Sequence, residues 1–192
     1  MNLKIISQKI ESGSLSLKKQ RDIVNFLFVK LTGKNIKHSK TGRPILDKSV
    51  DVSISHKDNL VSVGIVNSPH KVGIDIENIN TNFNAELFLN SVINKTEIPF
   101  LKTFCEDKNI SLSSAVAIFW SIKESFFKCL DYDLKPGKIN ILNISKDNEV
   151  KIDFSNEIKC LMKERKLKLC FMKSIFDENN VFSHTIMKES LL

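Results

Sequence analysis

Two short motifs constrain what this chain can fold into more than any other feature of its sequence. The first reads VGIDIE, with Asp75 and Glu77 two residues apart in a β-branched run, so a strand would point both carboxylates to one side. The second reads FWSIKESFFK, with Glu124 and Lys128 four residues apart, so a helix would set an acid beside a base. Three carboxylates beside a lysine predict a site for a hard divalent cation that faces a phosphate group.

Each motif also has a purely structural interpretation. An acidic pair at the end of a strand is often a solvated device that protects a sheet edge. A glutamate and a lysine at i and i+4 on a helix commonly form a surface ion pair, which contributes roughly 0.3 kcal/mol. Here bulky apolar residues surround both motifs. Charges in such surroundings need partners at depth or in a cleft, which favours the functional interpretation.

The composition sets broad limits. A chain of 192 residues can bury a core without disulfides or a structural metal, and 42% hydrophobic with 27% charged residues is typical of a globular protein. No apolar stretch is long enough for a signal peptide or a membrane span, so we expect a cytoplasmic protein with no membrane partner. The four cysteines lack CxxC spacing, which predicts buried, reduced thiols. The net charge of +7 indicates an anionic partner, although solvated surface lysines are the simpler explanation.

The hydrophobic periodicity predicts helices and strands in an α+β order: helix then strands, followed by helices then strands. The predicted helices are 16–32, 85–92, 94–103 and a long helix capped by Ser111 or Ser113 that ends at Leu130. The predicted strands are 50–55, 60–66, 71–77, 139–144, 150–154, 166–174 and 181–187. This order indicates two similar halves, 1–75 and 76–192, in one compact pseudo-twofold unit. We expect the active site at the seam between them, where ligands commonly bind.

Together, in this order and spacing, the two motifs resemble the 4′-phosphopantetheinyl transferase superfamily, in the two-halved monomeric type that activates surfactin synthetase and related carrier proteins. Three further segments strengthen the resemblance. Gly42-Arg43-Pro44 matches the family's Gly-Lys/Arg-Pro turn, Ile54-Ser55-His56 matches its Ile-Ser-His strand end, and Asn94 to Glu97 is similar to a segment with an additional acid. The resemblance covers roughly residues 20–145, and such motif matches need structural context to test them.

The resemblance implies a reaction and a metal ion. Members of the family move the phosphopantetheine arm of coenzyme A to a serine of an apo carrier protein and release adenosine 3′,5′-bisphosphate. By this resemblance Asp75, Glu77 and Glu124 hold Mg²⁺ against the diphosphate, and Lys128 neutralises phosphate oxygens as the leaving group departs. A basic protein suits both partners, since coenzyme A is polyanionic and carrier proteins are usually acidic. We expect a monomer.

The resemblance also assigns residues around the adenosine 3′-phosphate. Arg43, Ser55 and His56 would bind this end of coenzyme A, and Glu97 would deprotonate the serine. Without the resemblance, His56 is better explained as a structural histidine, and an ordinary turn residue is an alternative explanation for Arg43. After Lys128 the chain lacks the family's Gly-x-Gly turn, so we expect a different loop beside the pantetheine arm.

Two other functions compete with this interpretation. A non-catalytic module would keep the coenzyme A cleft and bind carriers, but a pure binder has no need of three metal-binding acids and a lysine. A basic nucleic-acid-binding protein would interleave lysines with exposed aromatic residues. This chain has one Tyr and one Trp, and its phenylalanines fall at predicted core positions. We therefore expect an enzyme with no nucleic-acid partner.

Overall fold

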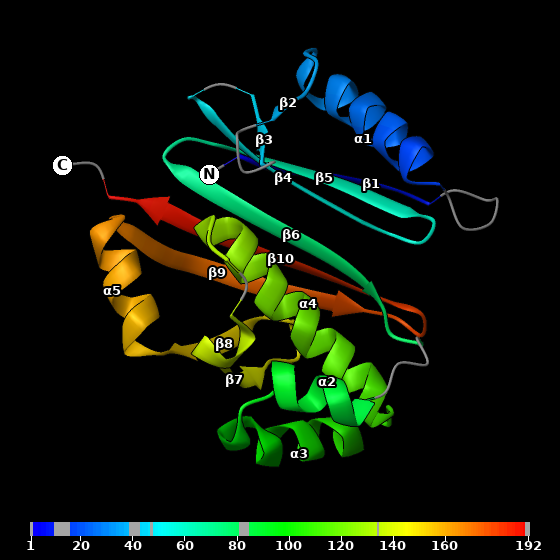
Figure 1. The fold of residues 1–192 in the computed structure, drawn as a ribbon, viewed down its shortest axis with the longest axis vertical. Helices are drawn as coiled ribbons and strands as arrows, with labels where there is room; N and C mark the ends of the chain where they lie inside the picture. The colour runs from blue at the N-terminus through cyan, green and yellow to red at the C-terminus, as the bar shows by residue number, and fades with distance from the viewer. Residues whose placement is uncertain are drawn as a thin grey trace.

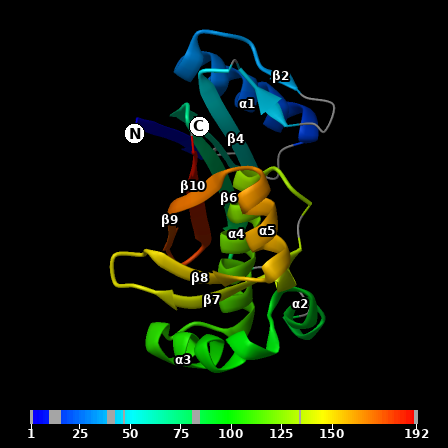
Figure 2. The same ribbon diagram turned by 90° about the vertical axis from the view of Figure 1, so that its left-hand side faces the viewer.

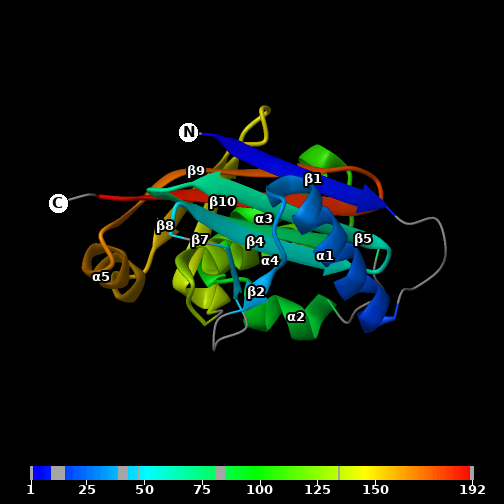
Figure 3. The same cartoon turned by 90° about the horizontal axis from the view of Figure 1, so that it is seen from above.

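The computed structural model describes residues 2–9, 16–38, 43–46, 48–80, 85–133 and 135–190. It mixes helices and strands, as predicted, and its long strands form two three-stranded antiparallel sheets (Figure 1). The first has the order β1 (Leu3–Lys9), β5 (Leu60–Asn67), β4 (Val50–Lys57). The second has the order β6 (His70–Asn78), β10 (Asn180–Glu189), β9 (Leu167–Phe176). Seen from above, the strands of both sheets run in one general direction (Figure 3).

Helices and short strands complete the fold. The helices are α1 (Leu17–Thr32), α2 (Ala85–Val92), α3 (Ile98–Lys108), α4 (Leu112–Leu130) and α5 (Asn156–Glu164), with single 3₁₀ turns η1 (Lys95–Glu97) and η2 (Pro136–Lys138). The short strands pair as β2 (Lys37–His38) with β3 (Pro44–Ile45) and as β7 (Ile139–Ile144) with β8 (Val150–Phe154). Helix α1 lies at one end of the molecule and α3 at the other (Figure 2). Within the described residues, no helix has the length and apolar character needed to cross a bilayer.

Helix α1 covers the first sheet. The hydroxyl of Ser16 accepts a hydrogen bond from the amide of Lys19 at its N-terminus, which satisfies a group that the helix leaves unpaired. Gly33 closes its C-terminus at a φ of 69°, in the left-handed region that suits glycine. Between these caps, Leu27 and Phe28 pack into one apolar cluster with valines of β4 and β5. The sequence therefore encodes both ends of α1 and its inner face.

Helix α4 runs along the second sheet, with α2 and α3 on its other side (Figure 1). Ser111 caps its N-terminus by accepting from the amide of Ser114, and Asp131 ends it in the left-handed conformation at a φ of 52°. Most of its residues are buried, as expected for a helix that is apolar nearly all round. It therefore forms the centre of the larger core.

The two sheets meet along β4 and β6, where side chains replace the usual backbone ladder. Because strand residues alternate in direction, residues 51, 53 and 55 all face β6. Each accepts a hydrogen bond from a backbone amide of that strand: Asp51 from Val72 at 2.8 Å, Ser53 from Ile74 at 3.0 Å and Ser55 from Ile76 at 3.1 Å. This side-chain ladder fixes the register between the sheets.

Most predicted elements are confirmed, with informative exceptions. The predicted helix over 94–103 is instead a 3₁₀ turn followed by α3, because Pro99 falls in the first turn of α3. Strand β1 and helix α5 were not predicted, although Ser155 caps α5 by accepting from the amide of Ile158. All four cysteines are free, but only Cys129 is buried, and Cys160 and Cys170 are exposed. The prediction of buried thiols was therefore wrong for these last two.

One buried histidine makes stability depend on pH. His184 lies on β10 and is 8% exposed, and its ring contacts Phe171 and Phe182. Burial, assisted by the charge of Lys173, lowers the pKa of His184 to about 4. Since the unfolded chain binds this proton near pH 6.5, folding stability is lost as the pH falls from about 6.5 to about 4.

We therefore expect His184→Phe to flatten this part of the stability profile. A shift of this size corresponds to about 3 kcal/mol between the two pH values. Urea unfolding of both proteins at several pH values measures the effect. Parallel profiles for the two proteins would show that His184 does not titrate as its burial indicates.

Candidate active site

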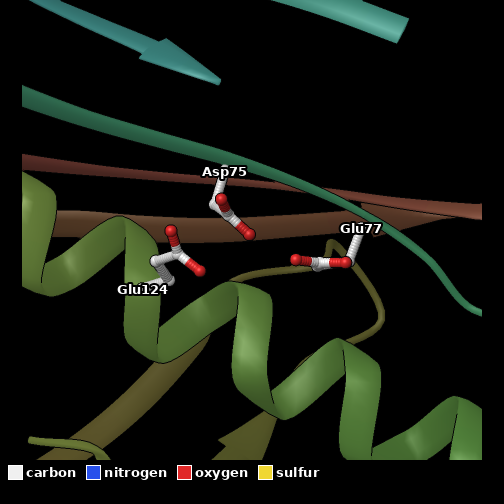
Figure 4. Close-up of side chains that lie close together, drawn as sticks. All are labelled: Asp75, Glu77 and Glu124. Carbon is white, nitrogen blue, oxygen red and sulfur yellow. The ribbon is translucent and has the colours of Figure 1, made fainter. Parts of the chain in front are cut away.

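The structure brings the three predicted acids together. Asp75 and Glu77 project from β6, and Glu124 projects toward them from α4 (Figure 4). One carboxylate oxygen from each residue lies within 4.8 Å of the others. Asp75 is 2% exposed, whereas Glu77 and Glu124 are half-buried. The cluster is therefore open on the side of the two glutamates.

The close approach of α4 to β6 depends on Gly73. A Cβ atom at this position would lie 1.9 Å from the carbonyl oxygen of Ser125 and 2.4 Å from the amide nitrogen of Cys129. Both are backbone atoms, so no side-chain rotation could relieve the overlap. The absence of a side chain at Gly73 therefore allows the helix that carries Glu124 to lie against the strand that carries Asp75.

Lys128 links the acids to the first sheet. Its Nζ lies 2.7 Å from Asp75 Oδ1 and 3.0 Å from Glu124 Oε1. The ammonium also donates to the hydroxyl of Ser55 at 3.3 Å. That hydroxyl donates in turn to Asp75 Oδ1 at 3.0 Å. Burial lowers the pKa of Lys128, but the charges of Asp75 and Glu124 outweigh burial and raise it.

The surroundings of Asp75 disfavour its charged form. Its pKa is raised to about 7, mainly by burial, which the charge of Lys128 opposes and the charges of Glu124 and Glu77 reinforce. Its second oxygen, Oδ2, is buried without a hydrogen-bond partner among the described residues. Such an oxygen gains most from a cation placed beside it. The three acids offer only oxygen ligands, which is the donor set that Mg²⁺ prefers, so the residues present fit this ion.

A second lysine at the cluster was not among the predicted site residues. Lys57 Nζ lies 2.8 Å from Glu77 Oε2. Lys57 is the last residue of β4 and continues the row of alternate side chains that face β6. The alternation of Asp51, Ser53 and Ser55 was the sequence signal that could have pointed to it.

A cleft of about 560 Å³ opens beside the acids. Residues of β4, together with Arg43 and Pro44, form one wall, and residues from α4 and the segment after it form the other. Its lining consists of Arg43, Pro44, Val52, Ser53, Ile54, Glu124, Phe127, Lys128, Asp131, Tyr132 and Asp133. A polar ligand in this cleft would therefore reach Glu124 and Lys128. Asp131, Tyr132 and Asp133, which follow where the family has its Gly-x-Gly turn, are part of this second wall.

Two residues predicted to bind coenzyme A have defined surroundings. The guanidinium of Arg43 forms an ion pair with Asp51 at 2.9 Å and donates to the carbonyl oxygen of Lys128. It therefore joins β4 to the last turn of α4 while it lines the cleft. His56 is exposed at the end of β4. The ring is still partly covered, and this partial burial lowers its pKa, as do the charges of Lys128 and Arg21, which indicates a positive neighbourhood.

Glu97 is enclosed rather than open to a substrate. It is 1% exposed, and its Oε2 lies 2.6 Å from the ammonium of Lys123, which is itself fully buried. The same carboxylate accepts from the amides of Asn94 and Ile141, both at 2.7 Å. These contacts occupy both oxygens. Its surroundings therefore do not support the expectation that Glu97 deprotonates a serine, and they give it a structural role.

We expect Glu97→Gln to destabilise the fold, because it leaves the buried ammonium of Lys123 without a counter-charge. The loss of one partner from a buried ion pair costs about 3 kcal/mol, which urea unfolding would measure. Glu157→Gln is the matched control, since Glu157 pairs with Lys135 and Lys138 at the surface, and we expect little change in its midpoint. Equal midpoints for the two variants would contradict this role.

Comparisons with known proteins support the family resemblance that the two motifs indicated. The family model described as the 4′-phosphopantetheinyl transferase superfamily matches residues 71–179. A search of curated protein sequences found no match.

Among solved structures, the holo-ACP-synthase of Plasmodium yoelii is 20% identical, with a TM-score of 0.51 over 65% of this chain and 100% of that one. The ACPS–CoA complex of Chronobacterium ammoniagenes is 16% identical, with a TM-score of 0.50 over 65% of this chain and 100% of that one. The holo-[acyl-carrier-protein] synthase of Neisseria meningitidis is 13% identical, with a TM-score of 0.50 over 62% and 98%. These likenesses show a shared fold. Because the matched region holds both motifs and more than half of the chain, this protein belongs to the 4′-phosphopantetheinyl transferase superfamily.

Proposed function

We propose that this protein transfers the 4′-phosphopantetheine group of coenzyme A to a serine of an apo carrier protein and releases adenosine 3′,5′-bisphosphate. The observation that carries the proposal is the convergence of Asp75, Glu77, Glu124 and Lys128 beside a cleft, in a member of this superfamily. The names of the similar solved structures, which include holo-acyl-carrier-protein synthases and a complex with coenzyme A, support it.

The three acids would hold Mg²⁺. When bound, the ion supplies charge neutralisation for the diphosphate of coenzyme A. The ammonium of Lys128 lines the cleft and would neutralise phosphate oxygens as the bond to the leaving group breaks. Asp75, which is held by Ser55 and Lys128, would keep its unpartnered oxygen directed at the cation.

The serine oxygen of the carrier forms the new bond to phosphorus, and the departing adenosine 3′,5′-bisphosphate takes the electrons of the broken P–O bond. The serine proton needs an acceptor that is open to the cleft. Glu124 lines the cleft and Glu97 is buried, so we assign this step to Glu124, directly or through water. Geometry within hydrogen-bond reach is the first requirement for such a base.

The adenosine end would lie near Arg43 and His56. His56 has two cationic neighbours, Lys128 and Arg21, and such a neighbourhood suits the 3′-phosphate. Ser55 is 5% exposed and donates to Asp75, so we assign its side chain to positioning Asp75 rather than to the phosphate.

We further propose that residues 1–75 and 76–192 are the two halves of a pseudo-twofold monomer of the surfactin-synthetase-activating type. The first three-stranded sheet, with α1 packed on β5, lies within residues 1–75. The second, with α4 packed on β6 and β10, takes β9 and β10 from residues 76–192, and the boundary between the halves falls inside its strand β6. The cleft has walls from both halves, which supports an active site at their seam.

Mass spectrometry of apo carrier proteins tests the function. Incubation with coenzyme A, Mg²⁺ and a panel of fatty-acid, polyketide and peptide carriers should add the mass of one phosphopantetheine group to at least one of them. A chelator should abolish the gain. If the protein binds coenzyme A but modifies no carrier in the panel, the non-catalytic binding module is the better explanation.

A further inference from the structure

We propose that Lys57 binds the diphosphate of coenzyme A, and that its ammonium exchanges Glu77 for a phosphate oxygen when substrate enters. This inference rests on the proposed function and adds a substrate-binding residue to it. The family resemblance did not point to Lys57, which lies outside the residues that the family model matches, 71–179.

The strand geometry places Lys57 firmly at the site. Residues 51, 53 and 55 of β4 each accept from an amide of β6. Since alternate residues share one side of a strand, Lys57 continues the same row. Its ammonium reaches Glu77 at 2.8 Å. A regular strand next to a hydrogen-bonded ladder therefore holds the backbone of this lysine, and only its long side chain needs to move.

Exposure shows which partner can leave. The side chain of Lys57 is 36% exposed, whereas that of Glu77 is 17% exposed. The side chain of Lys57 is therefore the more accessible member of the pair, so it is the one that can turn toward an incoming ligand. Lys128 is less free to change partners, because its ammonium contacts Asp75, Glu124 and Ser55 at once. Among the described residues, the ion pair with Glu77 is the one found for Lys57.

The charges explain the exchange. Three carboxylates and the two lysines leave a single negative charge when all five groups are ionised. With a divalent cation on the same carboxylates, the ammonium of Lys57 faces a like charge, which weakens its attraction to Glu77. The diphosphate that faces the cation is anionic, so it offers the ammonium a better partner within reach of the same side chain.

Calorimetry of three variants tests the proposal. Lys57→Met removes the positive charge, and Lys57→Arg keeps it. Lys71→Met is the matched control, because Lys71 forms an ion pair with Glu189 at 3.2 Å at the opposite end of β6. We expect Lys57→Met to bind coenzyme A and 3′-dephospho-coenzyme A about 10-fold more weakly in Mg²⁺, the loss of one charge-assisted contact. Lys57→Arg and Lys71→Met should bind both as the wild type does.

A second measurement uses Mn²⁺ alone. We expect Lys57→Met to bind this ion more tightly than the wild type, because a competing cation has gone. Weaker Mn²⁺ binding would show that Lys57 merely holds Glu77 in place, and would overturn the proposal. If Lys57→Met bound coenzyme A with unchanged affinity, the proposal would also be overturned. The same holds if Lys57→Met bound coenzyme A more weakly but bound 3′-dephospho-coenzyme A as the wild type does. Failure of the wild type to bind coenzyme A would instead refute the proposed function.

Discussion

Glu124→Gln is expected to abolish phosphopantetheinyl transfer while the protein stays folded. The change removes one of the three negative charges that would hold the cation, and it removes the group assigned to receive the serine proton. Loss of a preorganised electrostatic group of this kind lowers turnover by on the order of 10³-fold. The fold should survive, because the side chain is 25% exposed and Lys128 keeps its ion pair with Asp75.

The measurement is kcat/KM at saturating Mg²⁺, together with the Mn²⁺ affinity of the protein without substrate. Glu106→Gln is the matched control, since Glu106 is an exposed glutamate on the neighbouring helix α3. Its turnover and Mn²⁺ affinity should equal those of the wild type. Full transfer by Glu124→Gln would remove both roles proposed for Glu124.

Gly73→Ala is expected to lower the free energy of unfolding more than any other Gly→Ala substitution in the described part of the chain. The new Cβ would lie 1.9 Å from the carbonyl oxygen of Ser125 and 2.4 Å from the amide nitrogen of Cys129. Because both atoms belong to the backbone of α4, the whole helix must shift away from β6. We expect a loss of more than about 4 kcal/mol in the free energy of unfolding, which is exceptional for one substitution.

Gly64→Ala is the control on the neighbouring sheet. Its Cβ would meet the side chain of Ile74 at 3.1 Å, and a side chain can move by a few tenths of an ångström. We expect urea unfolding to show a small loss for Gly64→Ala and a large loss, or no folded protein, for Gly73→Ala. A Gly73→Ala protein of nearly wild-type stability would show that α4 does not depend on this close contact.

Local patterns predicted the parts of the site that depend on one element. The two-residue spacing of Asp75 and Glu77 on a strand, and the four-residue spacing of Glu124 and Lys128 on a helix, were enough to predict which side chains lie side by side. The caps of α1 at Ser16 and Gly33 are equally local. For the same reason the predicted bounds of most helices and strands are close to the observed ones.

Local sequence patterns could not predict contacts between segments that are distant along the chain. Glu97 lies in a segment that resembles the family, but its burial depends on Lys123 and on the amide of Ile141 in β7. The partnership of Lys57 with Glu77 depends on how β4 lies beside β6. Strand β1 was missed because its pairing with β5, rather than a strong pattern of its own, stabilises it.

The most direct test of the metal site is the anomalous scattering of Mn²⁺ in crystals grown with coenzyme A. The structure predicts one peak within bonding distance of oxygen atoms from Asp75, Glu77 and Glu124, and next to the diphosphate. A peak elsewhere, or bound coenzyme A with no cation at these three side chains, would contradict the metal site on which the proposed reaction depends.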